Sequence, residues 1–373
     1  MNIAIVCSCL EPGKDGVGDY TYLLASKLDN LGHIVYLISW NDRYVNVPQE
    51  SSDSKVLQLP QSTSKIERYR TANQWIKYKK IDIFSIQIVS YGYHTKGLFM
   101  DHYYLKLLCH GYKTHLHFHE LWVGMESHAS FKNRCLGWVQ RKCLVSFILY
   151  LQPDHITTSI ELYQLLLLQQ NIKATILPIF GNIQKAILSS LDIQSNDFPS
   201  IQILKSKVGD QQMLKVVFFG RIYPLVDLGI RIKEIKRQYT ISPILCVQLG
   251  RTSPESIENL QKTCKEVGID FVSLGGLEPN EVSAVLQFCD IGCSLMSGVF
   301  ALKSGANHAL FEHGKKVFYL DDFPLPSYLK PMDYINHNGL FCTFTAGMGF
   351  QLNSENESLG SESIAKKWLE ICQ

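Results

Sequence analysis

A short loop in the second half of the chain carries Lys303, Ser304 and Gly305, directly before an alanine-rich segment. A lysine side chain, a serine hydroxyl and the N–H groups of a helix N-terminus are groups that bind an anion such as a phosphate. Gly305 allows such an anion to approach the backbone closely. The sequence therefore predicts a phosphate-binding loop, and a solvated lysine on an ordinary loop is the alternative.

Regular elements on both sides of this loop would position it. Residues 291–295 alternate as a strand, residues 306–313 have helical spacing, and Gly314 precedes a further strand over 316–320. Just before them, a Gly275-Gly276 turn leads into a helix that ends near Asp290. Two successive strand–loop–helix units place helix N-termini at one edge of a parallel sheet, which is where open α/β sheets bind ligands.

A second glycine-rich loop, residues 11–21, follows the first strand of the chain. Gly16 and Gly18 permit close approach of a substrate, but Thr21 stands where a dinucleotide-binding fingerprint needs its third glycine. This spacing argues against NAD. Asp19 is predicted either to cap the following helix or to contact a substrate hydroxyl, and a plain tight turn is the alternative.

Three histidines alternate along the segment KTHLHFHE, so His115, His117 and His119 point to the same face of a predicted strand. Three imidazoles can ligate a metal, but strand neighbours two apart are separated by roughly 6.5 Å, which suits only a curved site. Two core histidines and one functional residue, His119, at the carboxyl end is the interpretation we favour. Glu120 follows at the same end.

Composition limits the class of protein. The chain has 373 residues, 46% of them hydrophobic and 19% charged, and its formal net charge is +2. This predicts two globular domains and no nucleic-acid partner. The 11 cysteines include no CxxC pair, and the first residues have the pattern of a strand, so no targeting segment is expected. Reduced thiols in a cytoplasmic protein are expected.

Strands and helices alternate in both halves of the chain, which predicts two open α/β domains. The first covers residues 1–185, a polar linker region covers 186–213, and the second domain covers 214–352. A final helix is predicted over 361–373.

The GVGDYT loop, the His119-Glu120 pair, the Gly220-Arg221 pair and the second-half glycine turn together resemble family 4 of the retaining glycosyltransferases. The resemblance covers nearly the full length. It implies the GT-B fold, an α/β architecture of two Rossmann-like domains facing across a cleft. It also implies that the last helix packs back on the N-terminal domain.

The resemblance assigns roles to single residues. Gly16 and Gly18 would lie beside the acceptor and donor phosphates, with Asp19 near an acceptor hydroxyl, and His119 would contact the donor sugar or the acceptor. Leu277 would contact the nucleobase. Arg221, Lys303, Ser304 and Gly305 would hold the donor diphosphate.

Two departures from the family pattern are visible. Val226 occupies the position of the usual lysine after Arg221, and Ala301 and Ala309 occupy the positions of the usual Glu-x7-Glu pair. The chain therefore resembles a variant branch, in which Lys303 supplies the missing charge. Glu312 is a candidate substitute for the lost carboxylates or, alternatively, a surface charge.

The expected activity is transfer of a sugar from a nucleoside diphosphate sugar to an acceptor hydroxyl with retention, in surface-glycan or polysaccharide biosynthesis. No cofactor and no obligatory metal are expected. The acceptor would be a glycan, a lipid-linked molecule or a small molecule. A catalytically silent homologue that binds a partner, and a sugar-nucleotide 2-epimerase, are the alternatives. The basic helix over 132–151 either packs in the first domain or makes a peripheral contact with the inner face of a membrane.

Overall fold

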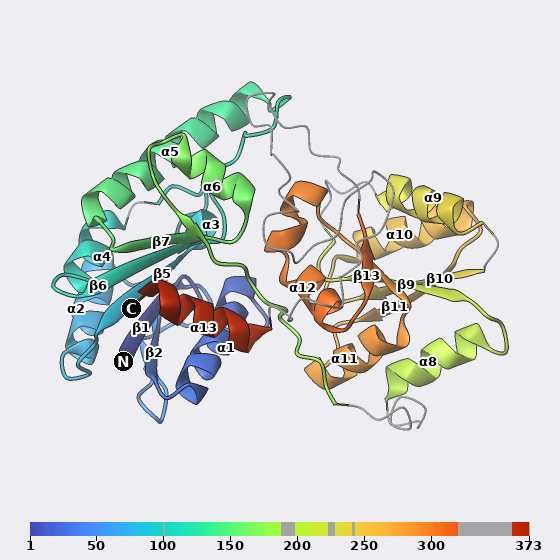
Figure 1. Cartoon of the computed structure of the whole chain (residues 1–373), viewed down its shortest axis with the longest axis horizontal. Helices are drawn as coiled ribbons and strands as arrows, with labels where there is room; N and C mark the ends of the chain where they lie inside the picture. Colours follow the sequence, from blue (N-terminus) through green and yellow to red (C-terminus); the bar gives the residue numbers. More distant parts are fainter. Residues whose placement is uncertain (100, 188–197, 223–227, 241–242, 320–359, 373) are drawn as a thin grey trace. The chain divides into compact units, whose positions relative to one another are not determined.

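The structure is a computed structural model that describes residues 1–99, 101–187, 198–222, 228–240, 243–319 and 360–372. The chain divides into two compact units (Figure 1). Of the described residues, the first unit contains 1–180 and the C-terminal helix, and the second contains those from 181 to 319.

The first unit is built on an eight-stranded sheet with the order β3-β4-β2-β1-β5-β6-β7-β8. Its strands are parallel except for β3, which pairs antiparallel with β4. The strands are β1 (Asn2–Cys7), β2 (Ile34–Asp42), β3 (Gln49–Glu50), β4 (Val56–Pro60), β5 (Ile83–Ile88), β6 (Lys113–Phe118), β7 (His155–Thr158) and β8 (Thr175–Ile176).

The central strands of this sheet are buried on both faces. In β1 the side chains from Ile3 to Cys7 are fully buried, and β5 is buried throughout. Continuous apolar runs of this kind form parallel strands that helices cover on both sides. The helices are α1 (Gly16–Asn30), α2 (Lys65–Ile76), α3 (Ser90–Tyr93), α4 (His102–Leu108), α5 (Phe131–Leu151), α6 (Glu161–Leu168) and α13 (Ser361–Cys372).

The C-terminal helix α13 belongs to this first unit and lies beside α1 (Figure 1). Ile364 and Trp368 of α13 are fully buried in the same apolar cluster as Leu24 and Leu28 of α1. Burial of side chains of this size stabilises a fold by about 1.5–3 kcal/mol each. The last residues of the chain are thus part of the core that its first residues form.

The second unit is built on a five-stranded parallel sheet with the order β11-β10-β9-β12-β13. The strands are β9 (Leu214–Phe219), β10 (Ile244–Leu249), β11 (Asp270–Gly275), β12 (Ile291–Cys293) and β13 (Lys316–Phe318). The helices are α8 (Pro199–Val208), α9 (Leu228–Gln238), α10 (Pro254–Glu266), α11 (Pro279–Phe288) and α12 (Gly305–Glu312), with a 3-10 helix η1 (Gly298–Lys303) before α12.

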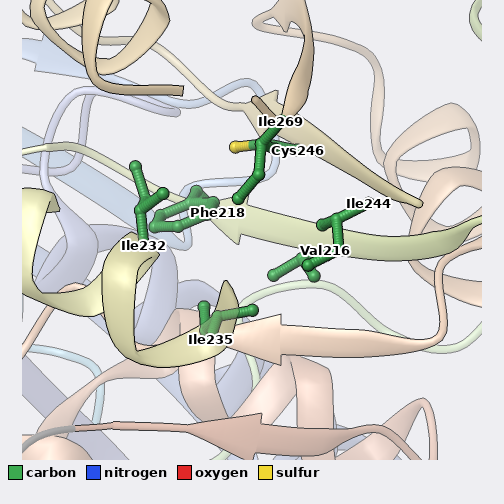
Figure 2. A pocket seen from close by; sticks show the side chains of 7 residues that line it. All are labelled: Val216, Phe218, Ile232, Ile235, Ile244, Cys246 and Ile269. Carbon is green, nitrogen blue, oxygen red and sulfur yellow. The ribbon is translucent and has the colours of Figure 1, made fainter. Parts of the chain in front are cut away.

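Alternate side chains of β9 pack into the two apolar cores of this unit. Val217 and Phe219 pack in the cluster that includes α8, α11 and α12, whereas Val216 and Phe218 pack in the cluster that includes α9 and α10. Figure 2 shows a small cavity in the second cluster, lined by Val216, Phe218, Ile232, Ile235, Ile244, Cys246 and Ile269. Its lining is entirely apolar, so it is a packing gap rather than a ligand site.

Most predicted elements occur within two or three residues of their predicted bounds. The linker predicted over 186–213 is different, because the described part of this range contains α8. Ile201 and Leu204 of α8 are fully buried, and the polar residues around them concealed this helical spacing. Strand β4 was not predicted from the sequence. Val226 and residues 320–352 of the predicted second domain lie outside the described residues.

The cysteines in the described part of the chain are all free, and most are buried. Across the same residues, no helix combines the length and the apolar character needed to cross a bilayer.

Candidate functional site

Two Gly-Arg pairs end neighbouring strands of the second unit. Gly220-Arg221 follows β9 and Gly250-Arg251 follows β10, and both glycines have a φ of +109°. A Cβ atom on Gly250 would stand 3.1 Å from the Gly220 backbone nitrogen, so the two turns are in direct contact. Both arginines are exposed. Two guanidinium groups therefore emerge at adjacent positions of one sheet edge, an arrangement that suits an anion.

The N-terminus of α12 lies at the same edge. A Cβ atom on Gly220 would be 3.4 Å from the Cβ of Ala306, in the first turn of α12. Ser304 is the N-cap, and its hydroxyl accepts a hydrogen bond from the Asn307 backbone N–H at 3.3 Å. The first-turn N–H groups of Gly305 and Ala306 have no partner within the helix. These groups carry the positive end of the helix dipole.

Buried polar side chains hold the Lys303 loop against α12. The Asn307 side-chain amide donates to the Ser294 hydroxyl at 2.8 Å and to the Ala301 carbonyl at 3.0 Å. His308 Nε2 lies 2.9 Å from the Leu302 carbonyl, to which it donates. Burial lowers the pKa of His308 to about 4, so this imidazole is neutral at pH 7. Lys303 itself lies beside the Phe300 ring, 5.3 Å from Nζ to the centroid.

The predicted nucleobase turn lies at the end of the third strand, β11. Gly275 has a φ of +66°, and Gly276 packs against Arg251, because a Cβ atom at Gly276 would be 2.8 Å from the arginine Cγ. The Leu277 side chain is half-buried against the apolar core of this unit. The Leu277 side chain therefore contributes to the packing of this core.

The two alanines at the positions of the Glu-x7-Glu pair of the resembling family are buried. Ala301 and Ala309 are both fully buried in the apolar cluster beside α12, where a carboxylate would be strongly destabilising. Glu312 is half-buried, and its Oε1 accepts a hydrogen bond from the Gly181 backbone N–H at 2.7 Å. Burial raises the pKa of Glu312 to about 7, and the Gly181 N–H opposes this shift. Glu312 therefore contacts the segment that enters the second unit.

In the first unit, the glycine-rich loop differs in detail from its prediction. The cap of α1 is Asp15, whose Oδ1 accepts from the Val17 and Gly18 N–H groups at 2.8 and 3.4 Å. Asp19 does not cap α1. Its Oδ1 accepts from the Gly13 N–H at 2.8 Å, which fixes the loop, and only Gly13 of this loop has a positive φ, of +67°.

Gly16 and Gly18 occupy different surroundings at the start of α1. A Cβ atom on Gly18 would lie 2.5 Å from the Cys9 carbonyl oxygen, so only glycine fits there. Gly16 is exposed, and no atom lies within 4 Å of where its Cβ would be. Gly18 is thus required by packing, whereas the space around the Cα of Gly16 is open.

The three histidines of the β6 segment lie on one face, as predicted, and are joined through other side chains. His115 Nε2 and His117 Nδ1 each lie 2.7 Å from the Thr157 hydroxyl. Burial lowers the pKa of His115 well below its usual value and that of His117 to about 3, so both rings are neutral. His119 is 8% exposed, and its Nε2 lies 2.9 Å from Gln87 Oε1. The described residues contain no cluster of three or more His, Cys, Asp or Glu side chains that could hold a metal.

Tyr20 connects these histidines with the glycine-rich loop. Its ring packs edge-on against the His119 ring, with 4.9 Å between the centroids, and stacks on Phe180 at 4.4 Å. The start of α1 and the carboxyl end of β6 therefore meet. Gly16, Gly18, Asp19 and His119 belong to one region of the first unit, and Arg221, Leu277, Lys303, Ser304 and Gly305 come from neighbouring turns of the second.

Three residues with prominent contacts in these regions, Arg251, Asp15 and Gln87, were not predicted as site residues. Arg251 repeats the Gly-Arg pattern of Arg221 one strand later, so the sequence could have predicted it. Asp15 is of a residue type that commonly caps helices and stands directly before a helical segment, so the sequence could also have predicted this cap. Gln87 is a lone glutamine in an apolar strand, and nothing in the sequence connects it with His119.

Comparison with known proteins supports the fold. No protein-family model matches the chain, and no curated protein matches it. Among solved structures, Anabaena HepE in complex with UDP and glucose is 13% identical, with a TM-score of 0.55 over 99% of this chain and 90% of that one. A glycosyltransferase from Rickettsia africae is 11% identical, with a TM-score of 0.56 over 99% and 87%.

A third similar structure is the lipopolysaccharide outer core galactosyltransferase WaaB in its apo form, which is 12% identical, with a TM-score of 0.50 over 91% of this chain and 84% of that one. All three span nearly the whole chain at low sequence identity, so they establish the fold. The protein has the GT-B fold, with two α/β domains built on parallel sheets.

Proposed function

We propose that this protein is a retaining glycosyltransferase, similar to family 4, that transfers a sugar from a nucleoside diphosphate sugar to an acceptor hydroxyl. One observation carries the proposal: the Gly220-Arg221 and Gly250-Arg251 turns and the N-terminus of α12 converge at one edge of the second sheet. Two guanidinium groups, a lysine and first-turn amides suit a diphosphate. HepE, which shares the fold, was solved with UDP and glucose, so UDP is the first nucleotide to test.

The chemistry follows from where charge develops. When the sugar leaves, negative charge grows on the diphosphate, and prepositioned cations and amides stabilise that charge more than they stabilise the intact donor. Arg221, Arg251 and Lys303 supply positive charge, while Ser304, Gly305 and Ala306 supply the helix N-terminus. In this proposal these groups do the work without an obligatory metal or cofactor.

The first unit supplies the groups that we assign to the acceptor side. Gly16 leaves the backbone at the start of α1 accessible, Asp19 holds the loop, and His119 contacts the sugar or the acceptor. The acceptor is a glycan, a lipid-linked molecule or a small molecule, in the biosynthesis of a polysaccharide or surface glycan.

Helix α5 favours an acceptor at a membrane surface. It contains Lys132, Arg134, Arg141 and Lys142 and no acidic residue. Its exposed positions include Phe131 at 83%, Trp138 at 54% and Leu149 at 67%. Large apolar side chains interspersed with cations bind the interface of an anionic bilayer. We therefore propose a peripheral contact of α5 with the inner face of a membrane.

Thermal unfolding with UDP, GDP, ADP and CMP, each with and without EDTA, tests the donor site. A nucleotide at a thousand times its dissociation constant adds ~4 kcal/mol of stability. Stabilisation by one nucleoside diphosphate, unchanged by EDTA, supports the proposal and names the base. Stabilisation by none of them contradicts it.

A substitution separates an active transferase from a silent homologue that binds a partner. Lys303→Ala should lower turnover about 100-fold or more, the usual effect of removing one transition-state charge contact. The matched control is Lys316→Ala, which removes an exposed lysine of β13 and should leave turnover unchanged. A silent homologue would show no turnover in the parent protein and would keep its partner in both variants.

A further inference from the structure

A buried chain of hydrogen bonds in the first unit runs from α13 to His119. Trp368 Nε1 donates to His115 Nδ1 at 3.1 Å, and the Ser85 hydroxyl lies 2.8 Å from the same nitrogen. Gln87 Nε2 lies 2.9 Å from the Ser85 hydroxyl, and Gln87 Oε1 lies 2.9 Å from His119 Nε2. Trp368, His115, Ser85 and Gln87 are each at most 1% exposed.

The hydrogen bond between Trp368 and His115 can have only one direction. The indole N–H of Trp368 can only donate, so His115 Nδ1 must carry a lone pair. Because His115 is neutral, its proton is on Nε2, which donates to the Thr157 hydroxyl at 2.7 Å. The Ser85 hydroxyl lies 2.8 Å from Nδ1, which bears no hydrogen, so it donates as well, and the Trp368 N–H and the Ser85 O–H share the one lone pair of this nitrogen.

The direction of this hydrogen bond fixes the directions of the next hydrogen bonds toward His119. Because the Ser85 hydroxyl uses its hydrogen to donate to His115, its oxygen can only accept a hydrogen bond from Gln87. The Gln87 amide therefore turns its NH2 group to Ser85 and its carbonyl oxygen to His119. In the opposite orientation two oxygen lone pairs would meet at 2.9 Å, which is repulsive. His119 Nε2 must therefore be an N–H group that donates to Gln87.

We infer that Gln87 is a positioning residue that keeps a hydrogen on Nε2 of His119, so that the neutral form of this imidazole has its lone pair on Nδ1. His119 then acts as a hydrogen-bond acceptor for a hydroxyl of the sugar or the acceptor, and not as a donor to the diphosphate. The role toward substrate rests on the function proposed above, whereas the tautomer is a property of the protein alone. No residue of the chain Trp368–His115–Ser85–Gln87 needs to touch substrate.

The tautomer can be measured on the ligand-free full chain by ¹⁵N NMR of the imidazole nitrogens, at about pH 8, above the ordinary histidine pKa of ~6.5. The ¹⁵N chemical shift of an imidazole nitrogen with a lone pair differs strongly from that of a nitrogen that bears hydrogen. The signals of His119 among the 12 histidines are identified by their loss in His119→Asn. The lone pair on Nδ1 is the expected result, and the lone pair on Nε2 would overturn the inference.

Variants test whether Gln87 is the cause. Gln87→Met keeps the size of the side chain but removes the acceptor, so His119 should show signals of both tautomers. Ser85→Ala frees the Gln87 amide to turn and should have the same effect, which provides a second variant if Gln87→Met does not fold. The control is Gln140→Met, which changes another fully buried glutamine of this unit, one that contacts Tyr91 and Val123. His119 signals unchanged in both Gln87→Met and Ser85→Ala would contradict the assigned role.

Binding and turnover separate this inference from the proposed function. Nδ1 lone-pair signals without stabilisation by any nucleotide would reject the proposed function and leave the tautomer standing. Stabilisation by a nucleotide with the lone pair on Nε2 would reject only the role of Gln87. If both hold, Gln87→Met should lower turnover about five-fold, the effect of one misdirected neutral hydrogen bond.

Discussion

The backbone N–H of Gly181 donates to Oε1 of Glu312 at 2.7 Å, although the two residues are 131 positions apart in the chain. Gly181 is the first residue of the second unit, and Glu312 is the last residue of α12. A Cβ atom on Gly181 would lie 2.7 Å from the Ala309 backbone, so only glycine allows this contact. The entry segment of the second unit is thus fixed to the helix that begins at the proposed diphosphate site.

This contact predicts a pH dependence of stability. Burial raises the pKa of Glu312 from 4.5 to about 7, so the folded state binds more protons than the unfolded state between these values. The contribution of this carboxyl to stability is therefore greatest below pH ~4.5 and is lost as the pH rises toward 7. At ~1.4 kcal/mol per pKa unit the loss is at most about 3.5 kcal/mol, and residual hydration of the half-buried carboxyl reduces it.

Glu312→Gln isolates this effect, because the glutamine oxygen can still accept from Gly181 but does not ionise. The variant should be more stable than the parent by about 1–3 kcal/mol at pH 8 and equally stable near pH 4.5. Urea unfolding across this range measures the difference. Buried histidines such as His117, whose pKa is about 3, make the stability rise with pH, which is the opposite trend. The parent and the variant both contain these histidines, so the difference between the two proteins does not include their effect. A constant difference across the range, or the same change in the exposed control Glu258→Gln, would count against the assignment.

The two glycines at the start of α1 should respond differently to alanine. Gly18→Ala places a Cβ atom 2.5 Å from the Cys9 carbonyl oxygen, so unfolding free energy should fall by about 1–3 kcal/mol. Gly16→Ala meets no atom within 4 Å and should be neutral or stabilising by up to ~1 kcal/mol. Denaturant unfolding of both variants measures this. Equal destabilisation of the two would show that the packing at Cys9 does not set the requirement for glycine.

Gly16→Ala also tests the proposed acceptor side. Because this variant should fold normally, any loss of turnover reports a methyl group in the path of substrate rather than damage to the fold. We expect a clear loss of turnover with little change in stabilisation by the nucleotide, since the donor is assigned to the second unit. Unchanged turnover would remove Gly16 from the site.

Arg251 should contribute to nucleotide binding as Arg221 does. Removing one charge-assisted hydrogen bond costs about 1.5–3 kcal/mol, so Arg251→Gln and Arg221→Gln should each weaken nucleoside diphosphate binding by roughly 10–100-fold. Isothermal titration calorimetry measures both. Arg237→Gln is the matched control, because it changes an exposed arginine of α9 that pairs with Glu234. Binding that is lost in Arg221→Gln and retained in Arg251→Gln would leave Arg251 outside the site.

The exposed face of α5 should bind anionic membranes. Cosedimentation with vesicles that contain phosphatidylglycerol should exceed that with phosphatidylcholine alone, and 1 M salt should weaken it. Replacing both Phe131 and Trp138 by alanine should lower the partition coefficient at least ten-fold. The control Ile230→Ala removes an exposed apolar residue of α9 in the second unit. Equal, weak sedimentation with both kinds of vesicle would reject the membrane contact.

Local signals in the sequence determined the fold class and many of the elements. Apolar runs such as Ile3 to Cys7 form buried parallel strands because covered parallel sheets need apolar residues on both faces. Ser304 and Gly314 mark the two ends of α12 because capping and positive φ depend on single residues. The Lys303 loop and the Gly220-Arg221 turn were found for the same reason: each is a short motif beside a recognisable strand or helix.

Partners far apart in the sequence were decided only by the tertiary structure. Glu312 contacts Gly181, and Trp368 contacts His115 across 253 positions, and neither pairing leaves a local pattern. The sequence could thus name His119, but its tautomer depends on the direction of hydrogen bonds in a buried chain. That direction exists only when β5, β6 and α13 are packed together, because each donor is defined by the acceptor that folding brings to it.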